Sequence, residues 1–463
     1  MQFGEALPPL EVDIDLIRRL DRNGPRYTSY PTADRFVKTF TASDYREWVK
    51  KRDKTNPLSI YVHLPFCNTV CYYCACNKVI TKDKTKAAEY LGYLFREIEM
   101  QGELLGKTSP VEQLHWGGGT PTFLSDEEMS SLMGKIGEHF RLVDDGEYSI
   151  EIDPRKVNEA TIATLARIGF NRISLGVQDF DPEVQLAVNR IQTEEETVRV
   201  IHAARSEGFK SVSIDLIYGL PMQSVQGFLR TLDKVIETAP DRISIYNYAH
   251  LPLVFKPQRR IEEKDLPAPK EKLEILDQTI RRLTAAGFLY IGMDHFAKPS
   301  DELAIAQRKG MLHRNFQGYS THADCDLLAL GVSAIGKIGP TYSQNFRSLE
   351  DYYEHIGKGE LPIMRGLVLN SDDLLRRDII QALMCHFALS KADLEAKHAI
   401  RFDEYFKEEL SILKDLAREG LVELGDDAIR VSPKGRLLIR NICMVFDRYL
   451  ALDENQVKYS KVI

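Results

Sequence analysis

The sequence has no long hydrophobic run, no basic amino-terminal stretch and no net positive charge. None of its uncharged apolar segments reaches the roughly 18 residues that a membrane span requires, so no span is expected. The acidic start, MQFGEALPPLEVDID, lacks the basic stretch and apolar core of a signal or transit peptide, and we therefore expect a cytoplasmic protein. A formal charge of -7 argues against nucleic-acid binding, because nucleic-acid-binding surfaces are usually basic.

Low-complexity tracts and internal repeats, beyond an alternation of strands and helices, are also missing. The composition, with 43% hydrophobic and 28% charged residues, is that of a globular protein and excludes a disordered, collagen-like or disulfide-stapled chain. At roughly 150 residues per domain, the 463 residues predict about three domains, although α/β barrels can run to about 250 residues as one domain.

Strand patterns alternate with amphipathic helical patterns along the middle of the chain. We expect strands at residues 59–65, 113–120, 148–154, 172–178, 211–221 and 242–250. We expect helices at residues 87–101, 126–140, 194–207, 226–238 and 270–286. This alternation predicts an α/β protein with a parallel sheet, either a barrel of about six βα repeats or a doubly wound open sheet. Reactive or backbone-exposing groups end almost every strand, which favours a barrel rim with one shared pocket.

The composition also divides the chain into three segments. We expect an amino-terminal arm over residues 1–50, a catalytic barrel over 51–360 and a small, mostly helical domain over 361–463. The last segment contains the strand-turn-strand pattern LVELGDDAIRV and an expected helix over residues 435–450, which indicate winged-helix-like features. Winged helices bind DNA or serve as packing modules, and the acidic chain favours packing.

Four of the seven cysteines are crowded into ten residues, in HLPFCNTVCYYCACNKV. In a cytosolic protein such a cluster indicates metal binding or redox chemistry rather than disulfides. Cys67, Cys71 and Cys74 follow C-x3-C-x2-C spacing, and soft thiolates select zinc, copper(I) or iron-sulfur clusters. A structural zinc site normally has four ligands, often from two cysteine pairs, whereas here no second pair exists and Cys76 lies awkwardly close to Cys74. The spacing therefore favours a [4Fe-4S] cluster with one open iron over zinc and over buried or redox-active cysteines. Cys325, Cys385 and Cys443 are expected to be packing residues.

The cysteine loop resembles that of the radical S-adenosylmethionine (SAM) superfamily. This resemblance implies a partial (β/α)6 barrel in which Cys67, Cys71 and Cys74 bind a [4Fe-4S] cluster and SAM chelates the fourth iron. It also implies reductive cleavage of SAM to methionine and a 5′-deoxyadenosyl radical, which abstracts hydrogen from the substrate.

Nine sequence blocks extend the resemblance over nearly the whole chain. They are PRYTSYPTADRF, YVHLPFC, QLHWGGGTPT, EIDP, GVQDF, DLIYGLP, YNYAHLP, IGMDHFA and HRNFQGY. They resemble the oxygen-independent coproporphyrinogen III oxidase family, which oxidatively decarboxylates two propionate side chains of coproporphyrinogen III to vinyl groups, giving protoporphyrinogen IX in haem biosynthesis. Ala75 replaces a glycine that the family often carries, for which we expect a small change in loop freedom.

The family resemblance assigns roles to individual residues. Tyr61 would lie beside the SAM sulfonium, and Cys76 would be important for catalysis without being a cluster ligand. Backbone N–H groups of Gly118, Gly119 and Thr120 would bind the methionine part of SAM, because glycines allow close approach. The resemblance also implies two SAM molecules. The other expected cofactor contacts are Tyr73, Glu151, Gln178, Arg190, Asp215, Ala249, Phe316, Gln317 and Ile335. Taken singly, each has an ordinary alternative, such as a core role for Tyr61 or a surface role for Arg190.

Coproporphyrinogen carries four carboxylates around an apolar macrocycle, so its pocket is expected to contain guanidinium groups and aromatic walls. The candidate arginines are Arg26, Arg35, Arg259, Arg260 and Arg314. The amino-terminal arm resembles a segment that packs over the pocket mouth. The resemblance further implies an electron donor such as flavodoxin or ferredoxin, and a monomer. Two other interpretations stay open: a haem chaperone with the same core, against which Cys76 and the amino-terminal block argue, and a zinc-stabilised regulatory protein.

Overall fold

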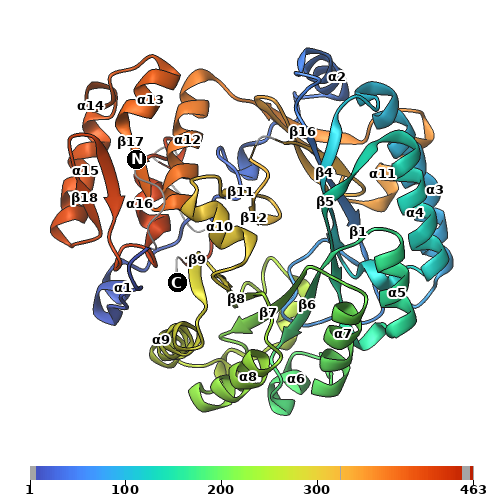
Figure 1. Ribbon diagram of the computed structural model, residues 1–463, viewed down its shortest axis with the longest axis horizontal. Coiled ribbons are helices and arrows are strands. Elements are labelled where there is room, and N and C mark those ends of the chain that lie inside the picture. The colour runs from blue at the N-terminus through green and yellow to red at the C-terminus, as the bar shows by residue number, and fades with distance from the viewer. Residues whose placement is uncertain (1–6, 324, 451–458, 462–463) are drawn as a thin grey trace. The chain divides into compact units, whose positions relative to one another are not determined.

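The computed structural model describes residues 7–323, 325–450 and 459–461 (Figure 1). The chain forms two compact units, each assembled from segments that are distant in the sequence. The barrel unit comprises Phe36–Ile275 and Asp324–Val368, and the terminal unit comprises Met1–Arg35, Leu276–Ala323 and Leu369–Ile463. The division into three segments expected from the composition stays a prediction. In the described part of the chain, no helix is long and apolar enough to cross a membrane.

A mostly parallel sheet forms the centre of the barrel unit, with strand order β16-β15-β14-β13-β1-β4-β5-β6-β7-β8. All six strands expected from the sequence are present and pair in parallel in chain order. They are β1 (Leu58–Leu64), β4 (Pro110–Gly118), β5 (Arg141–Ile152), β6 (Arg172–Gln178), β7 (Ser211–Tyr218) and β8 (Arg242–Asn247).

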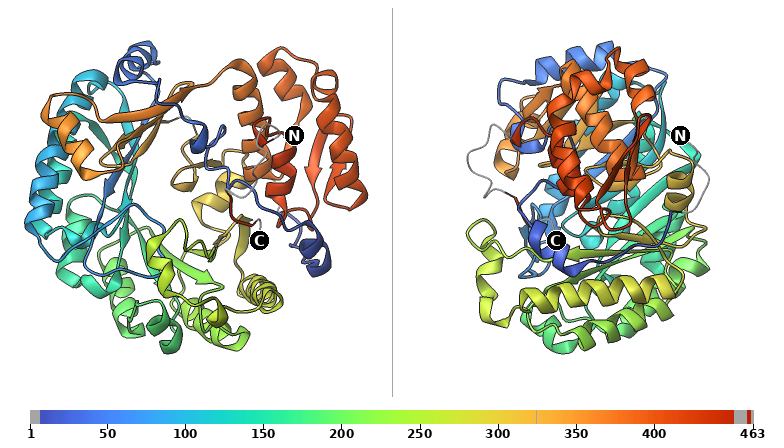
Figure 2. Two further views of the ribbon diagram at one scale, coloured as in Figure 1. Left: turned by 180° about the vertical axis from the view of Figure 1, so that it is seen from behind. Right: turned by 90° about the vertical axis from the view of Figure 1, so that its left-hand side faces the viewer.

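The helices that connect these strands lie outside the curved sheet (Figure 1; Figure 2, left). They are α3 (Thr85–Leu105), α4 (Asp126–His139), α5 (Glu159–Arg167), α6 (Pro182–Ala187), α7 (Glu194–Ser206) and α8 (Val225–Glu237). A doubly wound sheet would have helices on both faces, so the arrangement confirms the partial (β/α)6 barrel. The boundary between the two units falls within α9 (Pro269–Ala285), and α2 (Ala42–Lys51) precedes the first strand.

Local signals explain where several of these helices begin. Ser125 precedes α4 and forms a capping box with Glu128, and Thr193 precedes α7 and forms one with Glu196. In each box the two side chains satisfy backbone N–H groups that the first helical turn leaves without partners. The strand β1 is buried along its length except at Tyr61, which is partly exposed. Such burial on both faces is typical of parallel strands covered by helices.

The sheet extends beyond the six predicted strands. The strand β13 (Asp326–Leu330) pairs in parallel with β1 on its other side, and β14 (Ile335–Ile338), β15 (Thr341–Asn345) and β16 (Ile363–Val368) continue the sheet in antiparallel fashion. All five residues of β13 are buried. A short, wholly buried apolar run has no period, which is why sequence reasoning missed this strand. The helix α11 (Leu349–Gly357) connects the last two strands.

The terminal unit is mostly helical in its carboxyl-terminal segment. It contains α12 (Ser371–His386), α13 (Lys391–His398), α14 (Phe402–Tyr405), α15 (Lys407–Arg418) and α16 (Ile439–Val445). A small antiparallel sheet has the order β17 (Ala388–Ser390), β19 (Ala428–Val431) and β18 (Val422–Leu424), so the predicted strand-turn-strand pattern is confirmed. The helix predicted over residues 435–450 was too long, because the main chain at Gly435 is packed against the carbonyl of Leu421 and helix begins only at Ile439.

Two hairpins and two short helices complete the terminal unit. The hairpins are β9 (Leu289–Gly292) with β10 (His295–Ala297), and β11 (His313–Asn315) with β12 (Gly318–Ser320). The helices are α1 (Ile14–Leu20) and α10 (Glu302–Arg308).

Candidate active site

A cavity of about 290 Å³ lies at the carboxyl ends of the parallel strands of the barrel unit. Twelve of the residues expected in the site line it. They are Cys67, Cys71, Tyr73, Cys74, Cys76, Gly118, Gly119, Thr120, Glu151, Gln178, Arg190 and Asp215. These residues come from loops and strands spread over 149 positions of the sequence, and the parallel topology brings them to one rim.

The cysteine loop leaves β1 and is held at several points by main-chain and side-chain hydrogen bonds. The short strands β2 (Phe66–Cys67) and β3 (Val79–Ile80) pair in parallel and close the loop at its base. The amide of Asn189 donates to Val70 O at 2.8 Å, and the amide of Gln258 donates to Tyr73 O at 3.0 Å. The carbonyl of Tyr73 is therefore already engaged, which limits the main-chain contact to a cofactor expected from this residue.

The thiols of this loop suit a metal cluster better than a disulfide. Cys67, Cys71 and Cys74 are all free thiols and half-buried, whereas Cys385 and Cys443 are fully buried, as expected for packing residues. The Thr120 hydroxyl donates to Cys67 Sγ at 3.5 Å, and Arg190 Nη1 donates to Cys71 Sγ at 3.7 Å. Donors directed at sulfur favour the thiolate, which is the form that binds metals.

The thiols differ in acidity. A hydrogen bond from the Cys76 thiol lowers the pKa of Cys74 to about 6, and the ammonium of Lys78 adds to this effect. Burial raises the pKa of Cys67 to about 11, which only a bound cation or a nearby donor would reverse. Three thiols within one loop, with no second cysteine pair beside them, fit a cluster held by three protein ligands.

Polar side chains continue across the inner face of the sheet in register. Tyr61 of β1 lies opposite His115 of β4, which lies opposite Ser149 of β5. The rings of Tyr61 and His115 stack with centroids 5.9 Å apart, and the Tyr61 hydroxyl lies 3.0 Å from His63 Nδ1. Tyr61 is therefore ordered by two histidines.

Glu151 is held as a carboxylate at the rim. Burial alone would raise its pKa, but a hydrogen bond and charge from His115, together with the Gly118 N–H at 3.1 Å, hold the pKa below its usual value. An ionised carboxylate accepts hydrogen bonds only, so Glu151 suits a ligand amine or hydroxyl group.

The N–H groups of the glycine-rich segment have acceptors within the chain. The N–H of Gly118 donates to Glu151, that of Gly119 to Leu64 O at 2.8 Å, and that of Thr120 to Phe66 O at 2.9 Å. The expected contact of these groups with the methionine part of SAM stays a prediction. Gly118 is needed for another reason: its φ is 115°, and a Cβ there would lie 2.7 Å from the His63 ring.

Arg190 joins the cysteine loop to the sheet. Its guanidinium donates to Gly176 O as well as to Cys71, and its Nη2 lies 3.5 Å from Asp153 Oδ1. Asp153 also binds Arg155, with Nη2 to Oδ2 at 2.6 Å. Burial would raise the pKa of Asp153, but these two guanidinium groups hold it below its usual value.

Gln178 ends β6 with a φ of 69°, an uncommon conformation for a residue with a side chain and one that gathers at functional sites. A Cβ on Gly176 would lie 2.7 Å from the Gln178 amide nitrogen, so a side chain there would displace the Gln178 amide. On the next strand Asp215 accepts a hydrogen bond from Ser174 Oγ at 2.8 Å. Burial raises the pKa of Asp215 to about 6, and the charge of Glu151 acts in the same direction.

Five expected site residues do not line this cavity. Tyr61, Ala249 and Ile335 belong to the barrel unit but lie outside its lining, and Phe316 and Gln317 form the turn of the β11–β12 hairpin in the terminal unit. Their expected contacts to SAM stay predictions.

Sequence reasoning missed several residues that line the cavity or support it. They are Asp153, Arg155, Ser174, Tyr246 and the supporting His115. The signal was available in part, because Ser174 and Tyr246 are polar residues at inward positions of otherwise apolar strands, as the register with Glu151 and Ile217 shows.

Comparisons with known proteins agree with this geometry. The model of the radical SAM superfamily matches residues 61–235, and that of the HemN C-terminal domain matches residues 369–438. The oxygen-independent coproporphyrinogen III oxidase of Pseudomonas aeruginosa is 53% identical over 460 residues, covering 99% of this chain and 100% of the relative. The enzyme of the same name from Escherichia coli is 48% identical over 458 residues, again covering 99% and 100%.

A solved structure, described as coproporphyrinogen III oxidase (HemN) from Escherichia coli and as a radical SAM enzyme, superposes with a TM-score of 0.92 at 48% identity. The match covers 96% of this chain and 100% of that one. Identity at this level over the full length of both chains shows the family. The chain therefore belongs to the oxygen-independent coproporphyrinogen III oxidase family of the radical SAM superfamily.

Proposed function

We propose that this chain catalyses the oxygen-independent oxidative decarboxylation of two propionate side chains of coproporphyrinogen III to vinyl groups, giving protoporphyrinogen IX. The observation that carries the proposal is the convergence of three free thiols with Glu151 and Asp215 in one cavity at the strand ends. The substrate is the one named for the relatives that match the whole chain. The proposal places the chain in porphyrin and haem biosynthesis.

Membership of the superfamily implies a [4Fe-4S] cluster and SAM, which when bound supply a 5′-deoxyadenosyl radical for hydrogen abstraction from the substrate. Cys67, Cys71 and Cys74 would hold the cluster. Arg190 and Thr120 donate hydrogen bonds to two of these sulfurs and would keep them oriented and in the thiolate form. Cys76 would stay outside the ligand set, as the family resemblance implies.

The cofactor-binding residues divide by the chemistry that each side chain offers. Glu151 accepts hydrogen bonds from an amine or hydroxyl group, and Arg190 offers positive charge to a carboxylate. Asp215 and Gln178 offer hydrogen-bonding groups on neighbouring strands. The remaining contacts in the proposal are Tyr61, Tyr73, Gly118, Gly119, Thr120, Ala249, Phe316, Gln317 and Ile335, the last of these toward a second SAM molecule.

Apolar and aromatic side chains line part of the cavity and would limit the access of water to the reaction. They include Tyr73 of the cysteine loop and Ile152 and Ile217 of the strands. The proposal also includes a monomeric enzyme and an external one-electron donor such as flavodoxin or ferredoxin, which returns the cluster to its reduced state.

The test is an anaerobic assay of the iron- and sulfide-reconstituted protein with coproporphyrinogen III, SAM and a chemical reductant. Porphyrin products and 5′-deoxyadenosine are followed in parallel by chromatography. We expect both products from the wild type, both lost in Cys71→Ala, and both kept in Cys443→Ala, a matched change of a buried cysteine outside the cavity. SAM cleavage with coproporphyrinogen III left unchanged would contradict the proposed substrate, and haem binding would then be measured.

A further inference from the structure

The structure separates the five arginines that the sequence offers as partners for the substrate carboxylates. Arg259 and Arg260 are exposed, and Arg259 donates to Pro252 O at 3.1 Å. Arg26 is paired with Asp294, and Arg35 lies 3.2 Å from Asp34. The fifth, Arg314, differs from all of these because it is buried and no carboxylate is paired with it among the described residues.

Arg314 lies in the β11–β12 hairpin of the terminal unit, where its backbone is firmly held. Its N–H donates to Gln381 Oε1 at 3.1 Å, and its carbonyl accepts from Gln381 Nε2 at 2.8 Å. Across the hairpin it is in register with Tyr319, and the guanidinium carbon lies 4.8 Å from the centre of that ring. The side chain is thus oriented by an aromatic ring and not by an acid.

The guanidinium group keeps unused hydrogen-bonding capacity. Arg314 is only 3% exposed, and its Nε and Nη1 atoms are buried with no hydrogen-bond partner in the described chain. In the turn of the same hairpin, Gln317 Nε2 is a second buried donor without a partner there. Buried donors are nearly always satisfied in folded proteins, so three such nitrogens in one eight-residue hairpin indicate that a ligand supplies the acceptors.

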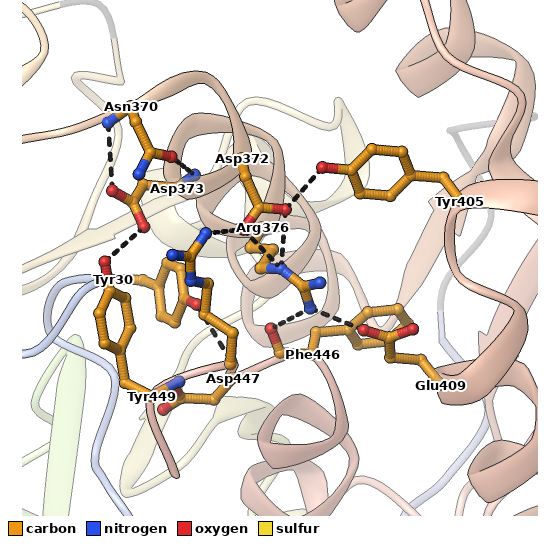
Figure 3. Close-up of polar contacts among 11 residues, drawn as sticks. Tyr30, Asn370, Asp372, Asp373, Arg376, Tyr405, Glu409, Phe446, Asp447 and Tyr449 are labelled. Carbon is orange, nitrogen blue, oxygen red and sulfur yellow. Dashed lines mark hydrogen bonds and ion pairs between the residues drawn. The ribbon is translucent and has the colours of Figure 1, made fainter. Parts of the chain in front are cut away.

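Arg376, in the same unit, shows how a structural arginine is accommodated (Figure 3). Its Nε donates to Asp372 at 3.0 Å, and its Nη1 donates to Glu409 at 2.8 Å and to Phe446 O at 3.0 Å. It also lies over an aromatic ring, that of Phe406, with 5.2 Å from the guanidinium carbon to the ring centre. Arg376 and Arg314 therefore both contact an aromatic ring, but Arg376 is only partly buried and has carboxylate partners.

A buried charge without a counter-ion costs free energy in the unliganded protein. Residues that lower stability in this way persist where function needs them. The guanidinium is a rigid fork of charged N–H donors that binds carboxylates. The unused atoms of Arg314 include Nε and Nη1, which lie on different edges of this fork and can each donate to a carboxylate oxygen.

We infer that Arg314 binds a propionate carboxylate of the porphyrinogen substrate. This inference rests on the proposed function and deepens it, because it selects one arginine as an anchor for the substrate. The side chain of Arg314 would then stabilise the complex with the substrate and destabilise the free protein.

The test compares Arg314→Met with the matched control Arg376→Met. For Arg314→Met we expect the KM for coproporphyrinogen III to rise at least about tenfold, as for loss of a charged hydrogen bond. Formation of 5′-deoxyadenosine in the absence of substrate should not change, and the thermal midpoint of the unliganded protein should stay the same or rise. For Arg376→Met we expect the reverse: a midpoint lower by several degrees with an unchanged KM. Arg314→Lys, which keeps the charge but loses the fork, should give an intermediate KM.

A binding experiment isolates the carboxylate itself. The affinities of wild type and Arg314→Met are measured for coproporphyrin III and for its tetramethyl ester, whose carboxylates are blocked. The wild type should bind the free acid more tightly than the ester. In the variant the ratio of these two affinities should be about tenfold smaller.

The outcomes separate the two proposals. If wild type makes protoporphyrinogen IX and Arg314→Met keeps both its KM and its preference for the free acid, the assignment of Arg314 is wrong and the proposed function stands. A lower midpoint with unchanged KM would make Arg314 a structural residue and would likewise overturn the assignment. If wild type leaves coproporphyrinogen III unchanged, the proposed function itself fails.

Discussion

The Nε2 atom of His115 lies 3.4 Å from Oε1 of Glu151, while its Nδ1 atom lies 2.7 Å from the hydroxyl of Ser149. An ionised carboxylate only accepts hydrogen bonds, so the imidazole donates to Glu151 through Nε2. The histidine thus keeps the Glu151 pKa below its usual value although burial acts in the opposite direction. It also stacks on Tyr61, which connects the two expected SAM-contacting residues through one ring.

We predict that His115→Phe weakens SAM binding and makes it pH-dependent. The phenyl ring keeps the stacking on Tyr61 but donates no hydrogen bond, so the pKa of Glu151 should rise and the carboxyl group should lose its charge at a higher pH than in the wild type. A hydrogen bond as long as 3.4 Å is weak, and we expect a three- to tenfold loss of SAM affinity, about 1 kcal/mol. The measurement is the Kd of SAM between pH 6 and 8. His115→Gln, which can donate, should recover much of the affinity, and equal affinities for wild type and His115→Phe at every pH would refute the role.

The buried Glu97 is expected to make the free energy of unfolding depend on pH. It is fully buried in α3 and accepts hydrogen bonds from Gly331 N at 2.7 Å, Asn345 Nδ2 at 2.7 Å and Tyr352 OH at 2.6 Å. Burial raises its pKa to about 7 despite these donors. The folded protein therefore retains a proton that the unfolded chain releases near pH 4.5, and stability falls as pH rises from there to about 7.

We predict that this decline amounts to on the order of 3 kcal/mol and is absent from Glu97→Gln, which cannot ionise. The measurement is the free energy of unfolding of the barrel enzyme between pH 5 and 8, for wild type and variant. Asp215→Asn is the control. The pKa of Asp215 is also raised, to about 6, so the part of the fall in stability that it causes should end at a lower pH. A difference between wild type and Glu97→Gln that does not vary with pH would show that Glu97 keeps its charge state.

Asp153 is expected to be a stabilising residue of the cavity wall. Its carboxylate pairs with Arg155 at 2.6 Å and Arg190 at 3.5 Å, and both guanidinium groups are largely buried. Removing it in Asp153→Ala leaves two buried charges without a partner, and we predict a loss of about 3 kcal/mol in the free energy of unfolding. The matched control is Arg230→Ala, which breaks an exposed pair with Asp181 and should cost below about 0.5 kcal/mol. Equal losses of unfolding free energy in the two variants, measured by chemical denaturation, would contradict the expected effect of burial.

The sequence predicted the features that depend on local patterns. Six parallel strands and the cysteine loop follow from period-two runs, turn residues and cysteine spacing, and the structure confirms the strands within a few residues at most ends. β5 is the exception, since it begins at Arg141, seven residues before the expected start, because Asp144, Asp145 and Gly146 interrupt the apolar pattern there.

Features that depend on distant pairs were not predictable from one sequence. The acceptors of the Gly118, Gly119 and Thr120 N–H groups lie on other segments, so the local sequence does not show which groups these N–H donors face. Likewise, nothing in the local sequence of Arg314 distinguishes it from Arg26, because the difference is whether an acid lies nearby in space.

Cys76 lines the cavity together with the three proposed cluster ligands. The family resemblance implies that it is important for catalysis without being a cluster ligand. We predict that Cys76→Ser retains iron and sulfide in wild-type amounts, because the three ligands are unchanged, but loses most of the formation of protoporphyrinogen IX. Cys74→Ser is the matched control and should lose iron, because a serine hydroxyl is a poor ligand for a soft metal site. Iron and sulfide analysis after anaerobic reconstitution decides between the two roles. If Cys76→Ser loses as much iron as Cys74→Ser, Cys76 is a ligand and the metal site has four thiolates.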